Sequence, residues 1–307
     1  MTVQALSSIL PILIALGIGL LSSKLLFSDK AVARLVSLIS PLVWGLLFLI
    51  GTEFGEVVSS LDAVGYVLKI SSLVAVATTV VPCMLLLGLV ALRGAGREPG
   101  RAASFDMHGA AAPLKECCIT LLMVALGVLF TYAESTVGSL WLPPSNVMLM
   151  VLIFLVGLDL SSIKLGRDWI SWGVLSVPIA VVIGSILGAY AVHFITGEDI
   201  RLLLALSTGF GWFTLSSVLV GGLSGEIHGA TALLADLGRE LIAIALLYLV
   251  GGFHPKVGIA AAGATALDST LPIVRQTCHC DTLPTALMSG LILTVLAPFF
   301  ITFFLTA

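Results

Sequence analysis

Four charged residues lie inside apolar stretches of the chain and could bind cations or protons. Asp236, Arg239 and Glu240 fall within ADLGRELIAIALLYLV (235–250), and Asp268 follows GIAAAGATAL. An ionised carboxylate in a hydrocarbon core costs on the order of 2.5–3.5 kcal/mol on insertion scales. Acids kept there are candidates for a functional site, because a carboxylate in this environment can exchange one cation for another.

Helical spacing separates the roles of the first three charges. Arg239 and Glu240 lie three and four residues after Asp236, so all three reach one broad helix face. We expect Asp236 and Arg239 to form a structural ion pair. If a helix covers 231–250, Glu240 lies about 15 Å along it, near the middle of a core about 30 Å thick. Glu240 is the acid that we expect to exchange one cation for another; a permanently protonated, hydrogen-bonded acid is the alternative.

Asp268 is surrounded by hydroxyl groups and by residues that interrupt helices, namely Gly263, Thr265, Ser269, Thr270 and Pro272. Unwound carbonyl groups and the C-terminal end of a half-helix both favour a cation. Two buried acids would hold protons until a cationic substrate displaces them. The sequence therefore predicts exchange of a cation for a proton.

The composition shows what must position these residues. Hydrophobic residues make up 59% of the 307 and charged residues 10%, against about 25% charged in soluble domains. We expect an all-α polytopic membrane protein with 8–10 transmembrane segments, forming a single integral membrane transport domain over residues 1–307. The candidate segments are 5–22, 35–51, 64–92, 117–135, 146–160, 172–195, 202–222, 231–250, 258–276 and 284–306. The polar stretch 93–116 is expected to be a loop.

Two of these segments should not be continuous helices. Segment 202–222 contains STGFGWFTLSS, with two glycines and several hydroxyl groups, and 258–276 carries Gly263 and Pro272 near its centre. Broken backbone at membrane depth is tolerated only against protein or a water-filled cavity. We expect both segments to be discontinuous or re-entrant. By contrast, Gly184 and Gly188 should let two helices pack closely.

The basic residues predict the orientation in the membrane. The first lysine follows the first apolar segment, which argues against a cleavable signal peptide. Lys and Arg concentrate in alternate loops, which places those loops in the cytoplasm and both termini outside. The basic residues used are Lys24, Lys30, Arg34, Arg93, Arg97, Arg101, Lys115, Lys164, Arg167 and Arg275.

A short internal similarity indicates an inverted repeat. LFLIGTEF (47–54) resembles IFLVGLDL (153–160), and the charge pattern places their ends on opposite membrane faces. Transporters built from inverted repeats hold their sites near the midplane. An aliphatic-Gly-acid pattern is also common at the ends of membrane helices, so the alternative is coincidence.

The remaining composition points to no metal, cofactor or nucleic acid. Five cysteines predict no disulfide framework, and CHC (278–280) lacks a fourth ligand nearby. A net charge of −3 gives no reason to expect a nucleic-acid partner. The oligomeric state stays open, a homo-oligomer included.

STGFGWFTLSS, DLGRELIAI and GATALDSTLPIVRQ resemble the corresponding stretches of the bacterial lysine exporter LysO family. The resemblance covers most of the chain and is densest over 207–276, within the expected functional region 202–276. It implies an inner-membrane exporter of L-lysine with both termini outside. It also implies two essential intramembrane acids, which by motif are Glu240 and Asp268.

Lysine itself explains a need for two acids, since both of its amines are cationic. Its carboxylate would need donors, such as exposed backbone N–H groups at a half-helix N-terminus. Ser216, Ser217, Thr265 and Ser269 are hydroxyl candidates along the substrate path. Gly263 lies on the same path, and Trp212 could cover the lysine methylenes or simply pack.

Other classes fit the sequence less well. GLSG (222–225) matches a rhomboid-type serine protease pattern, with His254 as the nearest base, but nothing in the sequence brings that base to Ser224. We therefore expect no enzyme. A channel would need no exchange of ions. A monovalent cation/proton antiporter with the same broken helices is the main alternative to L-lysine antiport.

Overall fold

The computed structural model describes residues 10–11, 14–22, 29–57, 61–92, 107–137, 143–161 and 171–306. Every regular element in these ranges is helical. The N-terminal part holds residues 14–22 and helices α2 (Asp29–Val36), α3 (Ile39–Val57), α4 (Leu61–Leu92), α5 (Met107–Val137) and α6 (Ser145–Leu160). The C-terminal part holds α7 (Trp172–Thr196), α8 (Ile200–Ser207), α9 (Phe213–Ser224), α10 (Glu226–Val250), α11 (Pro255–Ala262), η2 (Gly263–Leu267), α12 (Leu271–Thr277), η3 (Cys280–Thr282) and α13 (Leu283–Thr306).

Four described helical stretches are long and apolar enough to cross a membrane: Lys30–Gly55, Ala63–Ala91, Trp172–Thr196 and Leu283–Thr306. Shorter apolar helices cover Cys118–Ala133, Val147–Leu160 and Phe213–Ser224. Together with the composition, they support the expected all-α membrane class. The finer count of 8–10 crossings stays a prediction.

The expected loop at 93–116 is wrong in its second part. Residues 107–116 form the first turns of α5, because that helix continues through a polar N-terminal extension of its apolar run. Residues 93–106 lie outside the described part of the chain. Several of the basic residues that predict the orientation lie outside it as well, so the outside position of both termini stays a prediction.

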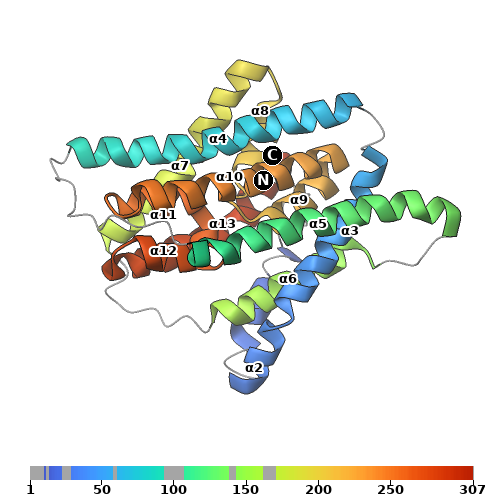
Figure 1. Cartoon of the computed structure of the whole chain (residues 1–307), viewed down its shortest axis with the longest axis horizontal. Coiled ribbons are helices and arrows are strands. Elements are labelled where there is room, and N and C mark those ends of the chain that lie inside the picture. The colour runs from blue at the N-terminus through green and yellow to red at the C-terminus, as the bar shows by residue number, and fades with distance from the viewer. Residues whose placement is uncertain are drawn as a thin grey trace.

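Figure 1 shows how the helices surround the C-terminal elements. Helix α4 runs along one side, α2 and α6 lie at the opposite end, α3 extends from them toward the start of α4, and α10, α11 and α13 lie between α4 and α6. Helix α10 packs against α4, α9 and α11, and α13 packs against α7, α8, α9 and η2. The central elements are therefore the ones that carry the candidate charges.

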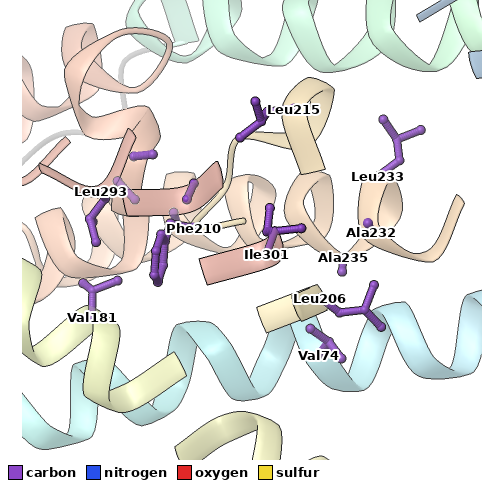
Figure 2. Close-up of a cluster of buried hydrophobic side chains, with 14 of the residues drawn as sticks. Val74, Val181, Leu206, Phe210, Leu215, Ala232, Leu233, Ala235, Leu293 and Ile301 are labelled. Atoms are coloured by element: carbon purple, nitrogen blue, oxygen red, sulfur yellow. The ribbon is translucent and has the colours of Figure 1, made fainter. Parts of the chain in front are cut away.

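Close helix packing depends on glycine at several crossings. A Cβ at Gly184 of α7 would collide with Pro82 of α4, and a Cβ at Gly188 would press on Ala77. The packing role predicted for Gly184 and Gly188 is confirmed. Around them, apolar side chains of α4, α7, α8, α9, α10 and α13 form the core, and Phe210 lies among them (Figure 2).

Candidate functional site

Both interruptions predicted from the sequence are present. The first break, Thr208–Trp212, separates α8 from α9, with positive φ angles of 53° at Phe210 and 97° at Gly211. The second break, Gly263–Thr270, follows α11 and begins with a φ of 65° at Gly263. Glycine favours such angles because it has no Cβ.

The two breaks touch each other. The Ala264 N–H of the second break donates a hydrogen bond of 2.8 Å to the Phe210 carbonyl oxygen of the first. A Cβ at Gly263 would collide with that same carbonyl and with the Arg239 guanidinium. Unwound backbone of one segment thus satisfies unwound backbone of the other, as burial of polar groups requires.

Asp236 of α10 belongs to the first break. Its side chain is 3% exposed, and its carboxylate accepts hydrogen bonds from the Gly211 N–H at 2.9 Å and the Ser216 hydroxyl at 2.5 Å. Gly209 lies against the same carboxylate, with no room for a Cβ. Since Gly211 and Ser216 flank the start of α9, the negative charge lies at the positive end of that helix.

Arg239 of α10 belongs to the second break. Its side chain is 1% exposed, and the guanidinium donates at 3.4 Å to the carbonyl oxygens of Ala260 and Ala261, in the last turn of α11. A third contact of 3.4 Å reaches the Ser185 hydroxyl of α7. The positive charge therefore lies at the negative end of α11.

The expected ion pair between Asp236 and Arg239 is not a direct contact. No salt bridge joins them in the described structure, although the two charges are close enough to interact electrostatically. The spacing along α10 would allow the pair. Instead, Asp236 binds donors at the first break and Arg239 binds carbonyl acceptors at the second break, because these groups lie closer.

Glu240 and Asp268 meet through Ser269. The Glu240 side chain is 2% exposed and accepts a hydrogen bond of 2.5 Å from the Ser269 hydroxyl. Asp268 accepts a hydrogen bond of 2.5 Å from the Ser269 N–H, and its own side chain is exposed. Helix α10 starts at Glu226, five residues earlier than expected, and Glu240 still lies close to its centre.

The expected burial of Asp268 is therefore not what the structure has. The acid lies where η2 ends, with a non-helical backbone, and its side chain turns to the surface of the isolated chain. Position along an apolar segment predicts a buried environment for both acids. The 3-10 turn changes the direction in which the second one points.

The other predicted path residues divide into two groups. Ser216, Ser269, Gly263 and Thr265 lie at the breaks; the Thr265 hydroxyl donates to the Ala262 carbonyl and lies 3.3 Å from the Thr270 hydroxyl. The buried Ser217 hydroxyl donates to the Thr214 carbonyl of its own helix, so no described contact brings it to the charges. Trp212 is half-buried at the start of α9.

Three contributors to the site were not selected from the sequence. Gly211 supplies an N–H to Asp236, Ser185 accepts from Arg239, and Phe210 supplies the carbonyl between the breaks. The G-x-G spacing of Gly209 and Gly211 was a usable signal for the first. Ser185 gave no signal, because a serine beside a packing glycine is ordinary in membrane helices.

The similarity to known proteins includes this region of the chain. A family model described as "Lysine exporter LysO" matches residues 121–305, more than half of the chain. The chain is 35% identical over 162 residues to "Lysine exporter LysO" of Escherichia coli, covering 52% of this chain and 54% of that protein. It is 33% identical over 159 residues to "Putative lysine exporter" of Haemophilus influenzae, covering 51% of this chain and 82% of that protein.

The match thus spans about half the length of the E. coli protein. No solved structure matches the chain. The residues of this chain that match the family model include both breaks and all of α10. The site geometry and the family match therefore concern the same residues.

Proposed function

This chain belongs to the lysine exporter LysO family, and from that premise we propose that it exports L-lysine across the inner membrane of a bacterium. The proposed mechanism is antiport, in which a proton and the cationic amino acid alternate on Glu240 and Asp268. The site is that of a transporter, and we assign it no catalytic activity.

The observation that carries the proposal is the order of exposure along Asp268, Ser269 and Glu240. Asp268 is exposed, Ser269 is half-buried and Glu240 is buried. Ser269 donates a hydrogen bond to each of the two acids. An amine of lysine can meet Asp268 first and then compete for Glu240, whose hydrogen bond Ser269 already orients. Burial of Glu240 favours its neutral or cation-bound state over a bare charge.

The exchange follows from this arrangement. When a protonated amine approaches Glu240, the carboxyl releases its proton and the amine takes its place as the cation. When the amine leaves on the other side, a proton returns. Because one carboxylate serves both guests, movement of lysine is linked to movement of protons in the opposite direction.

Two helix crossings in the N-terminal part have similar glycine contacts. Gly51 of α3 packs on the Val124 carbonyl of α5, and Gly157 of α6 packs in the same way on the Leu16 carbonyl. Gly51 and Gly157 occupy the same position in the internal similarity 47–54 and 153–160. We propose that these segments belong to an inverted repeat and that both broken segments cross the membrane, so that alternating access exposes the site to each side in turn.

Counterflow of labelled L-lysine in proteoliposomes with an imposed pH difference tests the proposal. Glu240→Gln and Asp268→Asn are each expected to abolish pH-dependent counterflow while the protein still inserts and folds. Matched controls are Glu226→Gln, at the first turn of α10, and Asp281→Asn, an exposed acid in η3. Wild-type rates in either Glu240→Gln or Asp268→Asn would contradict a role for that acid.

The same vesicles separate lysine antiport from the alternative. An internal fluorescent pH indicator reports whether external lysine or external Na⁺ dissipates a proton gradient. A response to Na⁺ without a response to lysine would favour a monovalent cation/proton antiporter. Lysine flux that ignores the pH difference would favour a channel.

A further inference from the structure

We propose that Asp236 and Arg239 are positioning residues that fix the two helix breaks separately, so that α10 sets the relative position of both breaks. The proposal rests on the transport function above, because the breaks carry the transport site. It replaces the simpler idea that the two residues exist to neutralise each other.

At the first break, Asp236 holds backbone and side chain together. Its carboxylate accepts from the Gly211 N–H, in the break itself, and from Ser216, in the first turns of α9. Gly211 lies just before α9 and Ser216 lies in its first turn, so the carboxylate connects the break to the start of the helix, where a negative charge interacts favourably with the helix dipole. Asp236 therefore fixes where α9 begins.

At the second break, Arg239 performs the complementary task. The last carbonyl groups of α11 lack partners within their helix, and the guanidinium donates to two of them. Its contact with Ser185 adds α7, so three helices meet on one side chain. A planar guanidinium can serve acceptors in several directions at once, which an ammonium group does less well.

This arrangement acts on the transport site through the chain itself. Glu240 directly follows Arg239 on α10, and its partner Ser269 lies in the second break. The position of the second break relative to α10 therefore determines the contact between Glu240 and Ser269. The small residues Gly209 and Gly263 leave the room that the two charged side chains occupy.

A double-mutant cycle distinguishes separate positioning from mutual neutralisation. Asp236→Asn and Arg239→Gln are each expected to lower lysine counterflow about tenfold, and the double variant is expected to lower it severalfold further, because contacts are then lost at both breaks. A double variant that exchanges lysine as fast as either single variant, or faster, overturns the proposal.

Arg239→Lys separates charge from geometry. It keeps the positive charge and loses the fork of donors, so a loss comparable with that of Arg239→Gln is expected. Wild-type counterflow in Arg239→Lys would show that charge alone matters and would overturn the proposal.

Milder variants keep the test usable if a charge variant fails to fold. Ser185→Ala removes one contact of Arg239, and Ser216→Ala removes one contact of Asp236. For each variant we expect severalfold lower lysine counterflow with a normal protein yield. The matched control is Ser71→Ala, since Ser71 is buried and donates within its own helix. Ser185→Ala should also shift the pH profile of counterflow, because it displaces Glu240 and Ser269; an unchanged profile overturns the positioning role.

The same double-mutant cycle can be measured by thermal unfolding in detergent, which needs no substrate. If the wild-type protein exchanges no lysine, the proposed function fails, and the unfolding data then decide the inference. Additive losses of unfolding temperature in the Asp236 and Arg239 variants support separate positioning. Recovery in the double variant contradicts it.

Discussion

At the scale of single residues, this site assigns a different partner to each buried charge. Asp236 takes donors of the first break, Arg239 takes acceptors of the second break, and Glu240 takes a hydroxyl. An uncompensated charge in a low-dielectric interior is costly, so each of these contacts contributes to folding. Glu240 differs from the other two because its partner Ser269 also binds the exposed Asp268, and for this reason we propose Glu240 as the acid that exchanges a proton for a cationic guest.

Ser269 is the residue whose loss should separate folding from transport. Ser269→Ala removes the hydroxyl that orients Glu240 but keeps the N–H that binds Asp268. We expect about tenfold slower pH-dependent lysine counterflow, the effect of one lost hydrogen bond to a charged group, with little change in yield. Ser176→Ala is the control, because that half-buried serine donates within α7. Equal rates in the two variants would refute this role of Ser269.

At the scale of elements, the contact between the breaks depends on backbone shape. Helix α11 ends at Ala262, and the positive φ of the following Gly263 turns the chain toward Phe210 and allows the hydrogen bond between the Ala264 N–H and the Phe210 carbonyl. Any side chain at this position meets that carbonyl and the Arg239 guanidinium. The second break is therefore defined by one glycine as much as by its charged neighbours.

Gly263→Ala tests this dependence. A residue other than glycine is strained at a φ of 65° with a ψ of −126°, by about 1–3 kcal/mol before any collision is counted, so lower thermal stability and reduced lysine counterflow are expected. Gly65→Ala is the matched control, because that glycine of α4 is exposed and has open space around it. Alanine there should leave stability unchanged or raise it slightly, since alanine favours helix. A neutral Gly263→Ala would mean that the break tolerates a side chain.

At the scale of the whole molecule, two helix crossings repeat one packing pattern. Gly51 lies against Gly127 of α5, and Gly157 lies against Gly19 of the helical residues 14–22. The partner carbonyl comes three residues before the partner glycine in both cases, from Val124 and from Leu16. This repetition of three-dimensional contacts supports the proposed inverted repeat more strongly than eight similar residues do.

Alanine at each crossing tests whether the two are equivalent. Gly51→Ala and Gly157→Ala should lower the unfolding temperature in detergent by similar amounts, because each Cβ meets a backbone carbonyl that cannot move aside cheaply. Gly17→Ala is the control on the same helical stretch as Gly19, with open space around it. A loss at one crossing without a loss at the other would contradict equivalent roles.

The sequence by itself determined the class of the protein and predicts which residues make up the candidate site. Its apolar content requires helices that satisfy their own backbone in lipid, and glycine and proline fix where two of them break. Asp236, Arg239, Glu240 and Asp268 stand out because charge in such surroundings is costly. These conclusions need only composition, periodicity and depth, which are properties of a single chain segment.

Tertiary structure alone decided which partner each charge takes. Helical spacing shows that Arg239 can reach Asp236, but it contains no information about Ala260, Ala261 and Ser185, which lie on other helices. In the same way, depth along a segment cannot show that a 3-10 turn directs Asp268 outward while Glu240 stays buried. Competition among donors and acceptors is resolved only when separate helices pack, because their distances are set by that packing and not by position in the sequence.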